Sequence, residues 1–367
     1  MKQSIVMVAS YGGPYGGNFI PSLIAYDQVA KELGYRTVYI FPGFVSDYPW
    51  VSEMQTVADK VYFVPYHQYT LDNVKRIRRI CKEENAAIVY SRMSGWDITA
   101  RLAMPRLPMI WHMEMELHLD SIKQKIKYWV KYRMMGGGKT YHISVSKNTA
   151  DIIDSLGVRN KCCWIPNAIS TERLNCKNQK QFKTPIRLLT FAYRPIVKGF
   201  DLALDACEEL NKNSVGFILK TSAQPDTFEY IKNRYGENVP EWLELIKPLE
   251  YISDLYDNSD IMLSPSRSEG FSYCLAEALY SGLPVVYSDV PGTSWADEMK
   301  MTYKFETGNG NELADAILKC ANTPVTEKEQ QYNRRLISEK YTIQAWMDKI
   351  RDYLESVRKS SRKGKDE

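Results

Sequence analysis

Apolar, strand-like runs and helical stretches alternate along this chain, and the alternation occurs twice, on either side of a polar stretch at residues 172–184. The strands expected before that stretch are residues 4–10, 37–41, 61–64, 87–91, 109–112, 141–145 and 163–165. Those expected after it are residues 186–191, 216–221, 261–264 and 284–287. Such alternation is typical of parallel sheets with helices on both faces. Two such blocks predict an α/β chain with two Rossmann-like, doubly wound domains that face a cleft, where a ligand binds.

The segments between these strands have the spacing of amphipathic helices. Helices are expected at residues 19–33, 72–84, 97–104, 146–156, 199–211, 226–235, 251–258, 274–281 and 311–322. The predicted domains are residues 1–175 and 184–340. Residues 341–358 are amphipathic and predict a helix that crosses back to the first domain. Residues 360–367 have no apolar side chain to bury, so we expect a disordered polar tail.

The composition excludes several classes of protein. The chain has 367 residues, 44% hydrophobic and 25% charged, which is near a globular average and argues against disorder or a collagen-like fold. No apolar run approaches the ~20 residues of a membrane-spanning helix, and residues 5–9 are too short for a signal peptide, so we expect a cytoplasmic protein. Seven cysteines without a CxxC pair, and only four histidines, argue against a disulfide framework or a structural zinc site.

Charge is distributed unevenly. Residues 1–183 hold 25 Lys and Arg against 15 Asp and Glu, whereas residues 184–367 hold 23 against 29. A basic half usually meets phosphate on a nucleotide, a nucleic acid or a lipid. Residues 73–83 are interpreted as a helix with a solvated basic face. Residues 117–135 interleave basic residues with apolar ones, which predicts either a core-facing helix, the preferred interpretation, or a helix lying on an anionic membrane at the inner face of the cell membrane.

The candidate site lies in the second block, in the sequence SPSRSEGFSYCLAEALYSGLPVV at residues 264–286. A loop carries Glu269, and a helix begins near Ser272. Backbone N–H groups at Ser272 and Tyr273 would favour a phosphate. Glu277 could accept hydrogen bonds from a ribose, and Glu269 could reach a sugar beyond the phosphates. Each glutamate alone fits a solvated or salt-bridged side chain better, so the assignment depends on the whole string.

This string closely resembles the E-x7-E segment of glycosyltransferase family 4, the retaining transferases of GT-B fold (glycosyl transferases group 1). Glu269 and Glu277 match the two family glutamates, and Gly270 and Phe271 complete the E-G-F that opens the segment. Residues 282–285 match the G-x-P-V that follows the helix. The resemblance covers most of the chain, and its specificity is concentrated in residues 192–292.

Two departures from the family pattern bear on the donor. Ser272 replaces the usual glycine after E-G-F, and its β-carbon could crowd the donor phosphates or change the sugar that is accepted. Residues 220–221 stand where many relatives have a G-x-G loop.

Arg194 and Lys198 supply two cations at a strand-to-helix turn, in the sequence AYRPIVKGFDLA at residues 192–203. Members of the family place an arginine and a lysine there to neutralise the donor pyrophosphate. Two fixed cations can offset the charge that develops as a nucleoside diphosphate leaves. Without the downstream string, an ordinary basic loop would be the preferred interpretation.

The first block resembles the acceptor domain of the family. Gly16 and Gly17, in the sequence YGGPYGGN at residues 11–18, match its paired glycines, which let the backbone approach the reacting sugar. His112 closes an expected strand and resembles a family histidine near the donor sugar. The sequence IPNAIS at residues 165–170 resembles the family's domain junction.

The resemblance implies a retaining, hexosyltransferase-type enzyme that moves a sugar from a nucleoside-diphosphate sugar to a glycan or lipid-linked acceptor, as in surface polysaccharide synthesis. In that mechanism Glu269 orients the donor sugar, Glu277 holds the ribose, and the departing phosphate accepts the proton of the acceptor hydroxyl. No cofactor is implied beyond the donor substrate. No metal is implied either, because Arg194, Lys198 and the helix N-terminus take its place, and no nucleic acid partner is expected.

Three alternatives stay open. A glycoside hydrolase could use two glutamates as acid and nucleophile, but it would not need cations beside a phosphate-binding helix. A nucleotide-sugar epimerase of GT-B-like fold would convert the donor without an acceptor. A non-enzymatic module that binds anionic lipid or nucleic acid would rest on the basic half alone.

Overall fold

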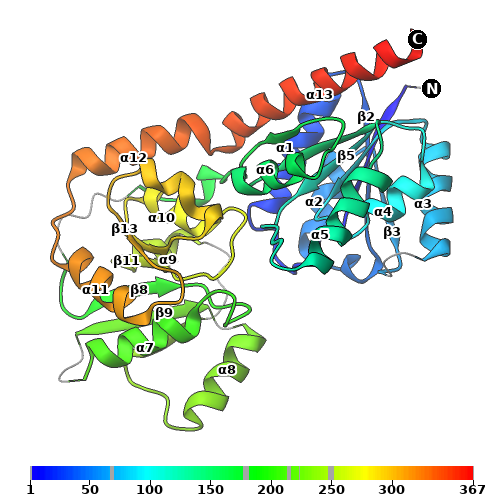
Figure 1. Cartoon of the computed structure of the whole chain (residues 1–367). Helices are drawn as coiled ribbons and strands as arrows, with labels where there is room; N and C mark the ends of the chain where they lie inside the picture. Colours follow the sequence, from blue (N-terminus) through cyan, green and yellow to red (C-terminus); the bar gives the residue numbers. More distant parts are fainter. Residues whose placement is uncertain are drawn as a thin grey trace. The chain divides into compact units, whose positions relative to one another are not determined.

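The computed structural model divides the chain into two compact units (Figure 1). It describes residues 2–66, 70–176, 182–212, 216–222, 224–246 and 252–366, with the backbone alone for residues 361–366. The first unit comprises Met1–Ala168 and Ile343–Glu367, and the second comprises Ile169–Thr342. Residues 177–181 of the expected polar stretch and residue 251 of an expected helix lie outside the described residues.

The first unit is built on a seven-stranded parallel sheet with the order β3-β2-β1-β4-β5-β6-β7. Its strands are β1 (Ser4–Ala9), β2 (Arg36–Pro42), β3 (Lys60–Val64), β4 (Ala86–Arg92), β5 (Met109–Met113), β6 (Thr140–Ser144) and β7 (Cys162–Trp164). Its helices are α1 (Phe19–Glu32), α2 (Pro49–Val57), α3 (Leu71–Glu83), α4 (Asp97–Ala103), α5 (Ile122–Trp129), α6 (Lys147–Ser155) and α13 (Ile343–Asp366), with short turns η1 (Gly43–Val45) and η2 (Val130–Met135).

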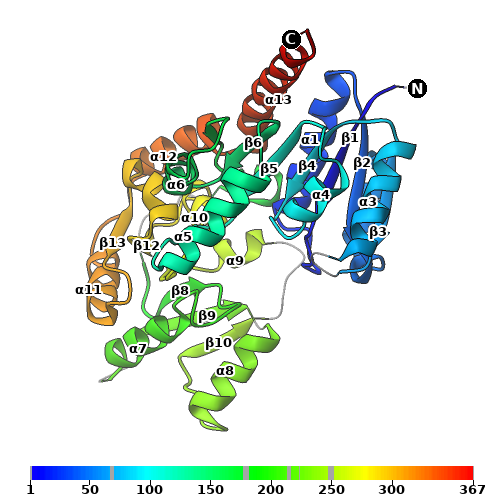
Figure 2. The same ribbon diagram turned by 45° about the vertical axis from the view of Figure 1, so that its right-hand side comes forward.

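Helices cover both faces of this sheet. Because successive side chains of a strand point to opposite faces, β1 contributes to two separate cores. Ile5 and Met7 pack in one core with apolar side chains of α1, α2 and α13. Val6 and Val8 pack in the other with side chains of α3, α4 and α6. Figure 2 shows α3 and α4, in cyan, beside one another. The doubly wound fold class predicted from the sequence is confirmed.

The C-terminal helix α13 belongs to the first unit. Trp346 and Ile350 are buried in the core that α1 shares, and Arg351 lies 2.8 Å from Glu32 of α1. The helix continues to Asp366, so the expectation of a disordered tail at residues 360–367 is wrong as far as that residue. A helix anchored by its apolar face gains one backbone hydrogen bond for each residue added, which extends it into the polar segment.

The second unit has a six-stranded parallel sheet with the order β10-β9-β8-β11-β12-β13. Its strands are β8 (Ile186–Thr190), β9 (Phe217–Ser222), β10 (Leu243–Ile246), β11 (Ile261–Ser264), β12 (Val285–Ser288) and β13 (Thr302–Phe305). Its helices are α7 (Phe200–Leu210), α8 (Pro225–Tyr235), α9 (Ser253–Asp257), α10 (Tyr273–Ser281), α11 (Gly310–Ala321) and α12 (Glu327–Lys340), with turns η3 (Thr171–Arg173) and η4 (Pro291–Glu298). The sequence did not predict β10, β13, α2 or α12.

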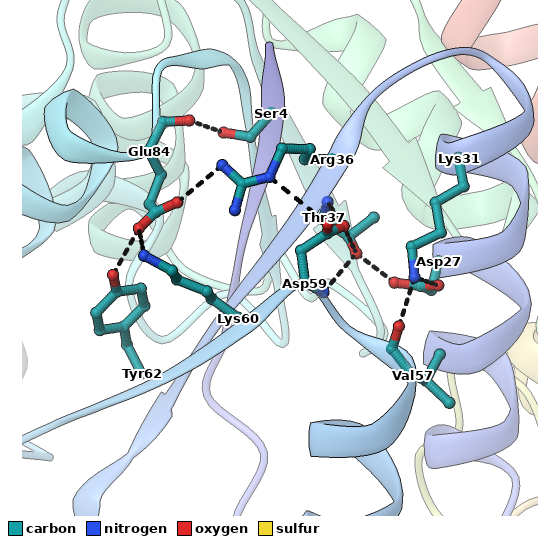
Figure 3. A network of polar contacts seen from close by, with 10 residues as sticks. All are labelled: Ser4, Asp27, Lys31, Arg36, Thr37, Val57, Asp59, Lys60, Tyr62 and Glu84. Carbon is teal, nitrogen blue, oxygen red and sulfur yellow. Dashed lines mark hydrogen bonds and ion pairs between the residues drawn. The ribbon is translucent and has the colours of Figure 1, made fainter. Parts of the chain in front are cut away.

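A polar network joins the amino ends of the strands in the first sheet (Figure 3). The buried carboxylate of Glu84 accepts hydrogen bonds from Lys60 and Tyr62, each at 2.7 Å, and lies 3.2 Å from Arg36. Burial alone would raise the pKa of Glu84, but these partners lower it below its usual value. Because the ligand edge of a parallel sheet is the opposite, carboxyl edge, we interpret this network as structural.

Candidate functional site

The loops after β8 and β11 meet at the carboxyl edge of the second sheet. These strands are neighbours, with β9 and β10 on one side of the pair and β12 and β13 on the other. The direction of winding reverses between them, and open α/β sheets bind ligands at such a switch point. The two loops carry Arg194 and Lys198 on one side and Glu269 on the other.

Lys198 and Glu269 form an ion pair across these loops. Lys198 Nζ lies 2.7 Å from Glu269 Oε1, and the two side chains are only 14% and 8% exposed. Ser266 Oγ donates a hydrogen bond to the same oxygen at 2.7 Å. Burial by itself lowers the pKa of Lys198, but the Glu269 carboxylate outweighs that effect and the net pKa is raised. The lysine is therefore a fixed cation, for which an incoming anion could compete with Glu269.

A close backbone approach and a side-chain ion pair hold the two loops together. Gly199 has a φ of +66°, and a β-carbon there would lie 1.8 Å from the carbonyl oxygen of Pro265. The guanidinium of Arg267 donates two hydrogen bonds of 2.7 Å to the carboxylate of Asp201, in the first turn of α7. Gly199 and Asp201 were not predicted as site residues from the sequence. The only feature of the sequence that points to them is their position just after Lys198.

Arg194 lies in the same turn as Lys198, but it is exposed. Its φ of +53° is in the left-handed region, which is uncommon for a residue with a side chain. Its backbone N–H donates to the carboxylate of Asp226, at the start of α8. In the described part of the chain its guanidinium makes no hydrogen bond or ion pair, so this cation is accessible to a ligand.

The helix α10 begins where the second loop ends. Its N-cap residue, Ser272, is 2% exposed and makes no side-chain capping bond to the helix. The Oγ atom of Ser272 lies 3.4 Å from that of Ser264. The helix N-terminus at Tyr273, which is half-buried, therefore keeps its partial positive charge. An anion could bind to these backbone N–H groups.

Phe271 of the E-G-F segment anchors the loop before α10. Phe271 is 5% exposed and stacks on Trp295, with 5.1 Å between ring centroids. Gly270 is half-buried between Glu269 and this aromatic anchor. The role of both residues in substrate binding stays a prediction.

Glu277 lies inside α10 and is only 2% exposed. The hydroxyl of Tyr256 donates to Glu277 Oε2 at 2.7 Å. Nη1 of Arg173 lies 4.0 Å from the other oxygen, Oε1. Sequence reasoning missed both partners, which are distant in the chain and carry no motif.

His112, in the first unit, is buried at the end of β5. Its Nδ1 lies 2.6 Å from the hydroxyl of Tyr90. Burial lowers the pKa of His112 to about 3, so the imidazole is neutral at physiological pH. Its Nε2 lies 3.9 Å from Glu114, which pairs with the fully buried Arg92. Arg92 and Glu114 were missed, although an arginine that closes an apolar strand is a visible signal.

The paired glycines lie in the loop before α1, also in the first unit. Gly17 has a φ of +52°, which favours glycine. A β-carbon at Gly16 would meet only ordinary contacts, at 3.4 Å from the side chain of Ile20. The backbone conformation therefore favours glycine at position 17, whereas the surroundings of position 16 leave room for a β-carbon.

The apolar stripe of the basic helix α5 is exposed, so the preferred interpretation of residues 117–135 as a core-facing helix is wrong for residues 122–129. None of its residues is buried, and Ile122, Ile126 and Trp129 are 69%, 57% and 46% exposed. The following turn η2 is anchored instead, through buried Tyr132 and through Lys131, whose Nζ lies 2.6 Å from Asp97. No helix in the described ranges is long and apolar enough to cross a membrane. The described residues also contain no cluster of three or more His, Cys, Asp or Glu that could hold a metal ion.

Comparison with known proteins identifies relatives of the chain. The sequence model of the family described as Glycosyl transferases group 1 matches residues 186–323, which span the two loops and α10. An uncharacterized glycosyltransferase of Methanocaldococcus jannaschii is 23% identical over 300 residues, or 79% of this chain and 81% of that protein. The amylovoran biosynthesis glycosyltransferase AmsK of Erwinia amylovora is 30% identical over 163 residues, or 42% of this chain and 40% of that protein.

Solved structures show the same fold. Anabaena HepE in complex with UDP has a TM-score of 0.76 and 16% identity, and the alignment covers 96% of this chain and 100% of that one. A glycosyltransferase from Rickettsia africae has a TM-score of 0.76 and 16% identity, covering 98% and 100%. At this identity the likeness concerns the fold alone, which is of GT-B type. Residues 186–323 thus match the family described as Glycosyl transferases group 1, and the fold of the chain is that of GT-B glycosyltransferases.

Proposed function

We propose that this enzyme transfers a hexose, with retention of configuration, from a nucleoside-diphosphate sugar to a glycan or lipid-linked acceptor. The observation that carries the proposal is the buried ion pair of Lys198 with Glu269 at the switch point, beside the start of α10. A cation, a carboxylate and a helix N-terminus within one pair of loops match the leaving diphosphate and the sugar of such a donor.

The chemistry assigned to these groups is charge stabilisation. The bond between the anomeric carbon and the diphosphate breaks, and the acceptor oxygen bonds to that carbon on the same face. The acceptor proton passes to an oxygen of the departing phosphate, so a glycoside and a nucleoside diphosphate are formed. Lys198, Arg194 and the N–H groups of α10 stabilise the leaving anion, while Glu269 orients the sugar. The neutral imidazole of His112 can donate or accept a hydrogen bond but adds no charge.

The relatives indicate which substrates to test first. HepE was crystallised with UDP-glucose, and AmsK is named for amylovoran biosynthesis. A matched protein of Escherichia coli is named as a putative colanic acid biosynthesis glycosyltransferase. We therefore propose a role in surface polysaccharide synthesis at the cytoplasmic side, with UDP-sugars as the first donors to test.

A donor screen tests the enzymatic proposal. The purified chain would be heated with a panel of UDP- and GDP-sugars, because a bound donor raises the midpoint of thermal unfolding. Donors that bind would then be incubated with glycan and lipid-linked acceptors, and the released nucleoside diphosphate measured. Release that requires an acceptor and is lost in Glu269→Gln supports transfer. Conversion of the donor to an epimer without acceptor would favour the epimerase, and binding of no donor would refute the proposal.

We propose further that α5 brings the enzyme to an anionic membrane. Its exposed face combines Ile122, Ile126 and Trp129 with the exposed cations Lys123 and Lys125. An amphipathic helix of this composition is suited to the boundary between anionic headgroups and acyl chains. A lipid-linked acceptor would lie at the same boundary.

A further inference from the structure

Two exposed aromatic rings meet at the carboxyl edge of the first sheet. Phe44, in the turn η1 after β2, is 52% exposed, and Tyr66, two residues after β3, is 44% exposed. Their rings are edge to face, with 5.4 Å between centroids and an interplanar angle of 86°. Exposed apolar side chains that gather at one place are a common mark of a binding site. We call this pair the aromatic shelf.

The rings of the aromatic shelf are held in place by the fold. The ring of Phe44 rests on the loop before α1, since a β-carbon at Gly12 would lie only 2.8 Å from Phe44 Cζ. The ring of Tyr66 lies 6.0 Å, centroid to centroid, from that of Trp96, which is fully buried. A ring that is fixed before binding loses little conformational freedom when a ligand stacks on it.

This support lies where the winding of the first sheet reverses. Gly12 follows β1 and Trp96 follows β4, and these neighbouring strands separate β2 and β3 from β5, β6 and β7. Open α/β sheets bind ligands outside the carboxyl ends of the strands at such a point. Between the same two strands, Ser10 Oγ donates a 3.2 Å hydrogen bond to the carbonyl oxygen of Met93. The φ of Met93 is +68°, and strained backbone of this kind clusters at binding sites.

The loops of the aromatic shelf and its support favour an uncharged ligand. They comprise residues 10–18, 43–48, 65–66 and 93–96. These residues include no Lys or Arg and a single acidic residue, Asp47, although the N-terminal half of the chain is basic. A phosphate group would therefore meet no cationic side chain on these loops.

A pyranose ring has the chemistry that the aromatic shelf can bind. The C–H groups on one face of the sugar can pack against an aromatic ring, while the hydroxyls at its rim stay hydrogen-bonded to water or to the Tyr66 hydroxyl. A hydrocarbon chain would cover that hydroxyl without offering it a hydrogen bond.

We propose that Phe44 and Tyr66 form a carbohydrate-binding surface that stacks against a neutral pyranose of the acceptor. The inference deepens the proposed function and rests on it for the identity of this sugar as the acceptor: it makes the acceptor a glycan with at least one uncharged sugar. Binding of the sugar does not require the donor site, because the aromatic shelf belongs to the first unit, whereas Lys198 and Glu269 belong to the second. The two sites can therefore be tested separately.

Saturation-transfer NMR on the whole chain tests the aromatic shelf. The probes are neutral oligosaccharides that end in glucose, galactose, mannose or N-acetylglucosamine, each titrated with and without UDP or GDP. The wild type is expected to bind at least one probe, with the strongest transfer to the C–H protons of one pyranose face. Phe44→Ala and Tyr66→Ala should each weaken this binding about fivefold or more, whereas Phe44→Tyr and Tyr66→Phe keep the ring and should retain most of it.

A matched control separates stacking on the aromatic shelf from a general effect of losing an exposed ring. Phe228 is 51% exposed in the second unit, so Phe228→Ala should leave sugar binding unchanged. The alanine variants of Phe44 and Tyr66 should also keep the thermal midpoint and the affinity for UDP or GDP of the wild type.

Three results would overturn the inference and leave the donor site intact. They are binding of no neutral sugar by the wild type, equal sugar binding in the alanine variants, and loss in those variants of binding to farnesyl phosphate but not to sugars. The last result would assign the aromatic shelf to a lipid chain. Sugar binding that depends on Phe44 and Tyr66, in a protein that binds neither UDP- nor GDP-sugars, would refute the proposed function and leave a carbohydrate-binding surface.

Discussion

Gly292 lies so close to Glu269 that a β-carbon on it would stand 1.9 Å from the carbonyl oxygen of Glu269. The backbone of Gly292, in the turn η4, therefore packs directly against the loop that carries the candidate catalytic carboxylate of Glu269. The backbone of Glu269 is thus held from two sides, by this turn and by the loop after β8. A clash with a rigid backbone cannot be relieved by rotating a side chain.

Gly292→Ala is therefore expected to displace Glu269 and to lower kcat by about tenfold or more, because small misplacements at a reacting centre are costly. The thermal midpoint should also fall, since the clash strains the folded state. Gly216→Ala is the matched control, because a β-carbon at Gly216 meets nothing within 4 Å. Steady-state kinetics that were equal in the two variants would contradict this account of the loop.

The two cations should respond differently to removal. Lys198→Ala and Arg194→Ala are each expected to lower transfer by about 10²-fold, the usual effect of losing a group that stabilises the developing charge. Only Lys198→Ala should also destabilise the fold, because it leaves the buried carboxylate of Glu269 without its ion pair. Arg194 is exposed, so its loss should leave the thermal midpoint unchanged. Full activity in either variant would contradict the assignment of the site.

Most of the fold could be predicted from the sequence because buried parallel strands are continuous apolar runs. The strand β1 at Ser4–Ala9 is an example, since all six of its residues are buried. The strands β10 and β13 were not predicted because they are four-residue edge strands that contain polar residues. The helix α12 was not predicted because its sequence is almost entirely polar. Their structure depends on neighbours that the local sequence does not specify.

Some residues of the candidate site can be predicted from the sequence, and others become visible only in the folded structure. The residue types and spacing that indicate Glu269, Glu277 and Lys198 are local, so the sequence reveals them. Arg173 and Tyr256 are recognisable only once the fold brings them to Glu277. The direction in which α5 faces was also not predictable, because an apolar stripe has the same spacing whether it meets a core or a membrane.

Acid should destabilise the first unit through two buried histidines. Burial lowers the pKa of His112 and of His142 to about 3, whereas an unfolded histidine titrates near 6.5. Between these values the unfolded chain binds more protons, so stability rises with pH across that window and is lost as pH falls below about 6.5. At pH 5 the loss is about 2 kcal/mol for each histidine.

The thermal midpoint would be recorded from pH 7.5 to pH 5 for the wild type and for His142→Asn. The variant should have a lower midpoint at neutral pH but a shallower decline toward acid, because one proton-linked group is gone. His118→Asn is the control, because it replaces a histidine that is exposed instead of buried. A decline of equal steepness in His142→Asn and the wild type would contradict this origin of acid sensitivity.

We expect binding to anionic membranes to depend on the exposed face of α5 and not only on the net positive charge of the first unit. Neutralising Lys123, Lys125 and Lys127 to Gln should weaken co-sedimentation with vesicles of phosphatidylglycerol and phosphatidylcholine by about tenfold or more at low salt. Replacing Ile122 and Trp129 by Ser should weaken it as well, because the helix then buries less apolar area in the bilayer.

The charge-matched control is the helix α3. Its residues Lys75, Arg76 and Arg79 are exposed, but its apolar side chains, such as Ile77, are buried in the core, as the sequence predicted for a solvated basic face. Neutralising these three residues removes the same charge from a helix that offers no apolar face. If binding depends on α5, this control should retain most of the vesicle affinity, and binding by the wild type should weaken with added salt. Equal losses in the two triple variants would mean that net charge alone, and not the exposed face of α5, draws the enzyme to lipid.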